Sequence, residues 1–144
     1  MTYDKLNSEE KVEKPFYYIA HNGQVHSEDS QYPVFVNEDA MFEIGNYYQN
    51  KETAAQNARA QVLWQCVRQF AARCDELLAP KDAENCGYTI NARWVEDYLA
   101  MAPWPHSSFD SAAVIFKTEP GCRAAISMFR NELIWYFTEY DPTR

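Results

Sequence analysis

The pattern of apolar and polar positions along this chain occurs twice. In the first half, an aromatic and β-branched run at 16–20 predicts a strand, and residues 47–54 change from an extended to a helical pattern. In the second half, a similar run begins at Tyr88, and residues 115–122 repeat the change. Position 17 therefore corresponds to position 88, an offset of 71, and position 47 corresponds to position 115, an offset of 68. The repeat predicts an α+β fold of two β-β-(β)-α modules, with antiparallel strands packed by two long helices.

The chain has the length of one ordinary domain. A chain of 144 residues can bury roughly two thirds of its unfolded surface. Residues 1–14 are polar and charged without periodicity, which predicts a mobile arm. We therefore predict a single α+β domain at 15–144, with module one at 15–79 and module two at 86–138.

Module one begins with a predicted hairpin. The dipeptide Asn22-Gly23 favours a tight turn between the strand at 16–20 and a return strand at 24–27. Pro33 and several turn formers predict a loop at 28–37 with a short extended piece at 34–36. Residues 40–48 then predict a third strand, in which Gly45 would mark a bulge.

A long helix follows in module one. Asn50 is the predicted N-cap, the helix runs from Lys51 to about Leu78, and Pro80 ends it. Steps of three and four residues predict a continuous apolar stripe made of Ala55, Ala58, Val62, Cys66, Phe70, Cys74 and Leu77. Additional apolar residues widen this stripe beyond what one small sheet needs. A homodimer through this helix, with Trp64 and Arg68 in the interface, is therefore one expected arrangement.

Module two repeats the order of strands and helix, with different residues at the ends of the elements. Residues 94–101 fit a strand by their position in the repeat, although Trp94-Val95 and Tyr98-Leu99 also fit a helical step, so a helix is the alternative. Pro103-Trp104-Pro105 is expected to end this element. Residues 112–117 predict a buried strand. Thr118 is the predicted N-cap of a helix from Glu119 to about Phe137, with Pro120 in its first turn.

Charge and composition exclude several function classes. The net charge is −8, and the Lys and Arg residues do not cluster, which argues against direct nucleic-acid binding. An acidic field instead attracts a basic partner. We find no apolar run long enough to span a membrane and no signal peptide, so we expect no membrane contact and a cytoplasmic location. Reducing conditions there would leave the four cysteines as free thiols: Cys66, Cys74, Cys86 and Cys122.

Catalytic chemistry has little support in the sequence. His21 and His26 flank the predicted turn near two acidic residues, but their spacing matches no metal motif, and solvated loop histidines are the simpler interpretation. His106 lies near Ser107, Ser108 and Asp110 in a loop without an oxyanion-hole glycine. We predict no catalytic residue, no metal and no cofactor. A small hydrolase or a ligand- or metal-binding protein using these histidines stays as one alternative, and a structural self-assembling protein as another.

Aromatic and acidic residues are the candidates for protein contact. Trp104 is a rigid aromatic between two prolines, and aromatic residues dominate interface energetics, although packing of Trp104 on the sheet is the alternative. A second aromatic pair surrounds Pro33, next to acidic residues. The predicted partner-binding residues are Glu28, Asp29, Tyr32, Phe35, Glu38, Asp39 and Trp104. We expect the partner to be a host protein or protein complex.

The element Glu43-Ile44-Gly45-Asn46-Tyr47-Tyr48, followed by Lys/Thr/Glu-rich residues and Ala at a helix start, resembles a family of small phage and prophage accessory proteins. The second unit at 114–126 is similar to the shorter strand-helix unit of that family, and the chain departs from the pattern at 103–105. The resemblance implies a phage accessory protein acting in the host cytoplasm and supplies no catalytic residue. It makes inhibition of a host defence complex, of CRISPR-type or otherwise nucleic-acid-handling, the expected class of function.

Overall fold

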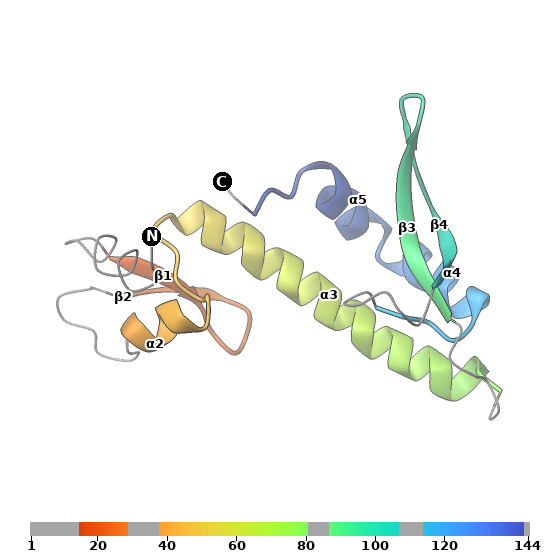
Figure 1. The fold of residues 1–144 in the computed structure, drawn as a ribbon, viewed down its shortest axis with the longest axis horizontal. Helices are drawn as coiled ribbons and strands as arrows, with labels where there is room; N and C mark the ends of the chain where they lie inside the picture. The colour runs from red at the N-terminus through yellow and green to blue at the C-terminus, as the bar shows by residue number, and fades with distance from the viewer. Residues whose placement is uncertain (1–14, 29–37, 81–86, 107–113, 143–144) are drawn as a thin grey trace. The chain divides into compact units, whose positions relative to one another are not determined.

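A computed structural model describes residues 15–28, 38–80, 87–106 and 114–142, and these residues form a mixed α+β fold (Figure 1). Two antiparallel two-stranded sheets pair β1 with β2 and β3 with β4. The elements in chain order are β1 (Phe16–Ile19), β2 (Val25–Glu28), α2 (Glu38–Glu43), α3 (Lys51–Leu78), β3 (Gly87–Val95), β4 (Tyr98–His106), α4 (Glu119–Met128) and α5 (Arg130–Thr138). The predicted α+β class is confirmed.

The chain divides into two compact units. Unit 1 comprises Met1–Gln61 and Asp141–Arg144, and unit 2 comprises Val62–Tyr140. Helix α3 contributes residues to both units. The predicted arm at 1–14, the extended piece at 34–36 and the linker at 81–86 lie outside the described residues.

Each module contains its own hydrogen-bonded bridge between the first strand of its hairpin and the residues that precede its helix. In module one, Tyr17 N donates to Tyr48 O at 2.7 Å and Tyr48 N donates to Tyr17 O at 2.8 Å. In module two, Tyr88 and Phe116 exchange the same two bonds, at 2.7 and 2.8 Å. The sequence repeat relates position 17 to 88 and position 48 to 116, so the bridging residues are equivalent in the two modules. The repeat therefore extends to individual backbone bonds.

Both predicted helix caps are confirmed. Asn50 Oδ1 accepts from the backbone N–H of Glu52 at 2.8 Å and of Thr53 at 3.4 Å. Thr118 Oγ1 accepts from Gly121 N at 3.2 Å, and Pro120 lies in the first turn of α4, where a helix lacks an N–H acceptor in any case.

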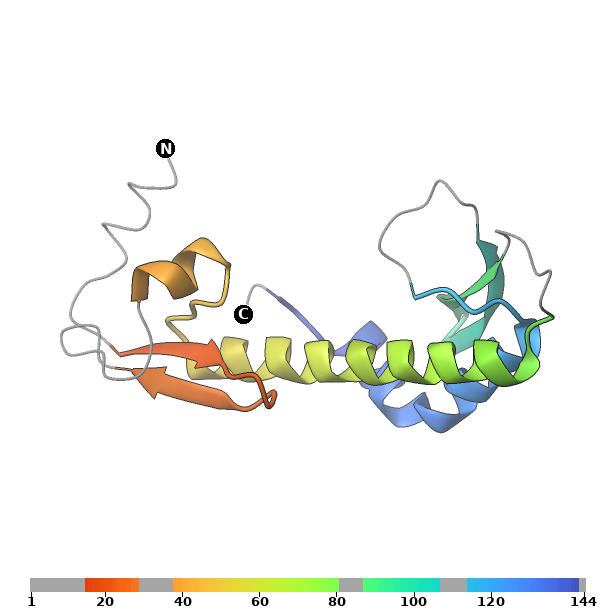
Figure 2. The same cartoon turned by 90° about the horizontal axis from the view of Figure 1, so that it is seen from below.

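The third strand predicted at 40–48 is wrong, because its first half forms helix α2. Gly45 ends α2 with φ 75° and is not a bulge. Its N–H donates to Phe42 O at 3.1 Å, and Asn46 N donates to Met41 O at 2.9 Å, which together form a Schellman motif. Only Tyr48 keeps the strand-like pairing. Helix α2 lies beside the β1–β2 hairpin (Figure 2).

The prolines at 103 and 105 do not end a strand, as predicted, but lie within β4. The backbone of Tyr88 points away from β4, toward Phe116. Pro105 is opposite Tyr88 and Pro103 is opposite Ile90, so both prolines occupy positions that make no ladder hydrogen bond. A missing N–H costs nothing there. The single strand predicted at 94–101 is wrong, because a turn at Glu96 and Asp97 divides this segment between the end of β3 and the start of β4.

Two further boundaries differ from the prediction. The strand at 112–117 is reduced to the single bridge at Phe116 within the described part of that segment. The helix predicted from Glu119 to Phe137 is divided into α4 and α5 at Phe129, where φ is −102° and ψ is 18°. No proline or glycine marks this division, so nothing in the local sequence indicated it.

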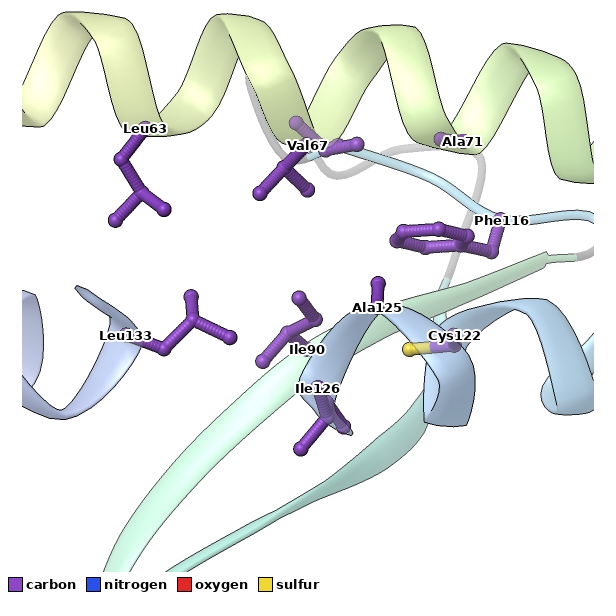
Figure 3. Close-up of a cluster of buried hydrophobic side chains, with 10 residues drawn as sticks. Leu63, Val67, Ala71, Ile90, Phe116, Cys122, Ala125, Ile126 and Leu133 are labelled. Atoms are coloured by element: carbon purple, nitrogen blue, oxygen red, sulfur yellow. The ribbon is translucent and has the colours of Figure 1, made fainter. Parts of the chain in front are cut away.

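The core of unit 2 is built from α3, β3, α4 and α5 together with Val114 and Phe116 (Figure 3). Helix α3 contributes Leu63, Val67 and Ala71, which are four residues apart. The predicted α3 stripe is therefore only partly correct: Ala58 and Cys74 are buried, but Val62, Cys66 and Leu77 are exposed.

Candidate protein-binding hairpin

The β3–β4 hairpin is longer than its counterpart in module one. Strands β1 and β2 have 4 residues each, whereas β3 and β4 have 9 each. The offset of 71 matches 16–19 to 87–90, so the additional residues are 91–102, which we call the hairpin arm. The arm extends beyond α4 to a free tip (Figure 1). The hairpin of module one has no counterpart of this extension.

The hairpin arm presents large apolar side chains to solvent. Trp94 and Tyr98 are each 60% exposed and Val95 is 46% exposed. Trp104, just beyond the arm, is 55% exposed. Core side chains of unit 2 such as Leu133 are fully buried, so the exposed residues of the hairpin are not part of a folded interior. They form the densest group of exposed aromatic residues in the described part of the chain.

Strand alternation divides these residues between two faces. Ile90 is buried and marks the core face, which also carries Trp94 near the tip. The opposite, outer face carries Val95 and Tyr98 as one cross-strand pair and Trp104 near the base. The two outer aromatics are six positions apart on β4, which corresponds to about 20 Å. The residues between them on this face of β4 are the small Ala100 and Ala102.

The turn at the tip contains an unfavourable backbone conformation. Glu96 has φ 55°, and no other non-glycine residue in the described ranges has a positive φ. A left-handed conformation costs an ordinary residue about 1–2 kcal/mol, and two-residue hairpin turns normally place Gly or Asn there. Neither Gly nor Asn occurs at 96 or 97, so the turn could not be recognised from its sequence.

Replacing Glu96 by Gly should stabilise the hairpin arm by up to about 1 kcal/mol, because Gly adopts positive φ without steric cost. Amide hydrogen exchange at Arg93 and Val95, whose backbones face β4, should slow. Asp97→Gly is the matched control, because Asp97 lacks a positive φ and gains nothing from Gly. Equal slowing by both substitutions would contradict the assignment of strain to Glu96.

The predicted partner-binding residues are distributed over both units. Trp104 is exposed on the outer face of the hairpin in unit 2. Glu28 is 7% exposed at the end of β2, which places its side chain inside unit 1. Glu38 and Asp39 begin α2. Asp29, Tyr32 and Phe35 lie outside the described residues.

Sequence reasoning missed Tyr98, Trp94 and Val95 as surface residues. The available signal was the order Tyr98, Ala100, Ala102, Trp104, in which large and small residues share one face of a strand. Recognising it required Pro103 to lie within the strand, and the prolines were instead expected to end it. The missed residues therefore follow from the misinterpreted prolines.

The histidines do not come together as a metal site. His26 is paired with Tyr18, at a ring-centroid distance of 5.7 Å, while His21 lies in the turn. The two histidines therefore do not face each other across the hairpin. No group of three His, Cys, Asp or Glu side chains suited to a metal occurs among the described residues. Of the cluster at His106, the residues Ser107, Ser108 and Asp110 are not described.

The described thiols are free, and two of them are protected. Cys74 and Cys122 are buried and Cys66 is exposed. Burial raises the pKa of Cys122 to about 11, and it also raises the pKa of Cys74, with a further contribution from the Asp75 charge. A raised pKa keeps a thiol protonated and unreactive at neutral pH. Neither buried cysteine is thus suited to act as a nucleophile.

The long helix offers a second, shallower surface. Cys66, Phe70, Arg73 and Phe129 are among the residues lining an open depression of about 550 Å³. Trp64, which is predicted to lie in a homodimer interface, is partly buried and has its ring centroid 5.2 Å from that of Tyr136. The depression is lined by both charged and apolar residues and holds no aromatic group as exposed as those of the hairpin arm.

Comparisons of the chain with protein-family models, curated proteins and solved structures found no match. Within the described residues, no helix is both long and apolar enough to cross a membrane. The function is therefore inferred from the geometry and chemistry of the hairpin arm.

Proposed function

We propose that this protein is a non-enzymatic protein-binding factor that contacts its partner with the hairpin arm. The observation that carries this proposal is that the arm extends beyond the shared module plan and exposes Trp94, Val95 and Tyr98. An isolated two-stranded hairpin is only marginally stable, and contiguous exposed apolar groups are typical of interaction sites. A partner that covers these side chains would stabilise the hairpin and would also remove its apolar groups from water.

Charge and resemblance suggest the class of partner. A net charge of −8 favours a basic protein surface, because opposite potentials accelerate association. The resemblance to phage accessory proteins makes a host defence complex, such as a CRISPR-type or other nucleic-acid-handling assembly, the proposed target. Inhibition would follow from occupation of a basic functional surface on that complex, and it would take place in the host cytoplasm.

The double substitution Tyr98→Ala with Trp104→Ala tests the proposal. Tagged wild-type protein is used to capture partners from host lysate, and the captured protein is then purified and titrated against each variant. Loss of two aromatic anchors should weaken binding by at least about 30-fold, because one such anchor typically contributes about 2 kcal/mol or more. The melting temperature should change little, since both side chains are largely exposed.

Leu77→Ala and Met128→Ala serve as matched controls, because they remove comparably exposed apolar groups from α3 and α4. Both should bind as wild type does. If the controls weaken binding and the double variant does not, the contact surface is helical and the hairpin arm has no role. If Trp104→Ala alone leaves affinity unchanged but lowers the melting temperature, Trp104 belongs to the fold.

A further inference from the structure

One edge of β3 carries backbone groups that point away from β4. Tyr88 exchanges both of its hydrogen bonds with Phe116 instead of β4. Residues on an antiparallel strand alternate between the two edges, so the N–H and C=O groups of Ile90, Ala92 and Trp94 point the same way as those of Tyr88. Among the described residues none forms a backbone bond with these three, which we call the open edge.

Module one closes the equivalent edge with a side chain. The backbone of Tyr17 is hydrogen-bonded to that of Tyr48, and the Asn46 side chain pairs with the next outward backbone position of β1, which is Ile19. Asn46 Oδ1 accepts from Ile19 N at 2.7 Å and Asn46 Nδ2 donates to Ile19 O at 2.8 Å, so one side-chain amide substitutes for a strand. The offset of 71 makes Ile90 the counterpart of Ile19.

Within the described residues of module two this closure is missing. The offset of 68 places Val114 at the position of Asn46, and a valine side chain can neither donate nor accept a hydrogen bond. Strand β3 also continues past Ile90 to Ala92 and Trp94, whereas β1 stops at Ile19. The open edge is therefore specific to the longer hairpin.

The opposite edge of the same hairpin is blocked. Pro103 and Pro105 occupy outward positions of β4, and neither has an N–H to donate to a neighbouring strand. Near the base of β4 an additional strand would therefore lack these two hydrogen bonds, while Met101 and Leu99 nearer the tip keep their N–H groups. Along β3 the donor at Ile90 is kept together with those of Ala92 and Trp94, so β3 offers the longer run of consecutive donors.

We propose that the partner contributes an extended segment that joins the hairpin as a third strand, antiparallel to β3, along the open edge. This inference rests on the proposed function, whose contact it specifies. The Tyr88–Phe116 bridge already pairs antiparallel at this edge, and the added strand continues that ladder toward the tip. Pairing with Ala92 and Trp94 alone supplies four backbone hydrogen bonds, two for each residue.

The side chains around the open edge define the chemistry of that segment. Trp94 is exposed beside the edge and favours an apolar residue on the added strand. Glu96 and Asp97 are exposed at the tip and favour a Lys or Arg where the segment passes them. A second copy of this chain is the less favourable occupant, because both copies carry a charge of −8.

The test removes one outward N–H and leaves the β3–β4 ladder unchanged. Ala92→Pro deletes the N–H of an edge position, just as Pro103 does on β4, whereas the control Ala92→Thr keeps the N–H and adds a β-branched side chain. The probe is a random twelve-residue peptide library selected on wild-type protein, from which enriched peptides are synthesised and titrated. Ala92→Pro should weaken binding at least tenfold, and Ala92→Thr should stay within about twofold.

Hydrogen exchange gives a readout that does not depend on how well the proline variant folds. On adding a selected peptide to wild-type protein, the amides of Ala92 and Trp94 should become protected. The amide of Arg93 faces β4 and should change less. Enriched peptides should combine alternating apolar residues with Lys or Arg.

The possible outcomes separate the two proposals. If peptides lose affinity for the Tyr98→Ala, Trp104→Ala protein but bind Ala92→Pro normally, the hairpin arm binds its partner and strand addition is overturned. If no peptide is enriched, or enriched peptides leave the Ala92 amide unprotected, strand addition is also overturned. A wild-type solution mass of twice 16.8 kDa that Ala92→Pro restores to the monomer value would assign the open edge to a second copy and overturn the partner segment.

Discussion

Replacing Phe116 by Ala should destabilise the protein by about 3–5 kcal/mol, a cost typical of deleting a fully buried aromatic ring. Phe116 is 0% exposed and belongs to the unit 2 core. Its backbone also forms both bonds of the bridge to Tyr88. The ring is surrounded by α3, β3 and α4, so the cavity cannot be filled by a single side-chain movement (Figure 3). Urea unfolding followed by circular dichroism measures the loss.

Ile115→Ala is the control for Phe116→Ala. Ile115 is the preceding residue and is 41% exposed, so its truncation removes less buried area than truncation of the fully buried Phe116. We expect a loss below about 1 kcal/mol. Similar losses for both variants would show that the segment before α4 contributes as a whole and that Phe116 is not its anchor.

Replacing Gly87 by Ala should destabilise the protein by about 1–3 kcal/mol, although Ala ordinarily favours a folded state by restricting the unfolded chain. A Cβ at this position would overlap the Ile115 side chain and lie 2.8 Å from the Phe116 carbonyl oxygen. That oxygen accepts the Tyr88 N–H at 2.7 Å, so it cannot retreat without lengthening the bridge. The melting temperature should fall accordingly.

The double variant Gly87→Ala with Ile115→Ala locates the conflict. Shortening Ile115 removes the side-chain overlap but leaves the carbonyl contact unchanged. If the backbone contact dominates, the double variant should remain less stable than Ile115→Ala alone. Full recovery of stability would instead assign the conflict to the Ile115 methyl group.

The parts of the fold that were predictable depend on local signals. Asn50, Thr118 and Pro120 act within one helical turn, and their roles could be inferred from neighbouring residues. The repeat was also predictable, because matching patterns recur at fixed offsets. Helix α2 was not, because Gly45 serves a bulge and a helix end equally well, and the choice depends on hydrogen bonds to Met41 and Phe42.

The candidate site was predictable only in part, for a related reason. Trp104 was recognised because two prolines isolate it in the sequence. The same prolines were expected to end the strand, and their compatibility with β4 depends on which edge of the strand they face. That edge is determined by the Tyr88–Phe116 bridge, a contact between residues far apart in the sequence. Tyr98 and the open edge therefore required the tertiary pairing to be known.

The Asn46 amide has a consequence for colloidal behaviour. A strand edge with unsatisfied backbone groups can template the stacking that leads to fibrils, and natural sheets protect such edges. Asn46 protects β1 by hydrogen bonding, and the two prolines protect β4 by lacking donors. Among the described residues, strand β3 has neither form of protection. In concentrated solution, the molecules are therefore kept apart mainly by repulsion between their net negative charges. High salt screens that repulsion, so pairing of the exposed β3 edges of two copies should then become more favourable.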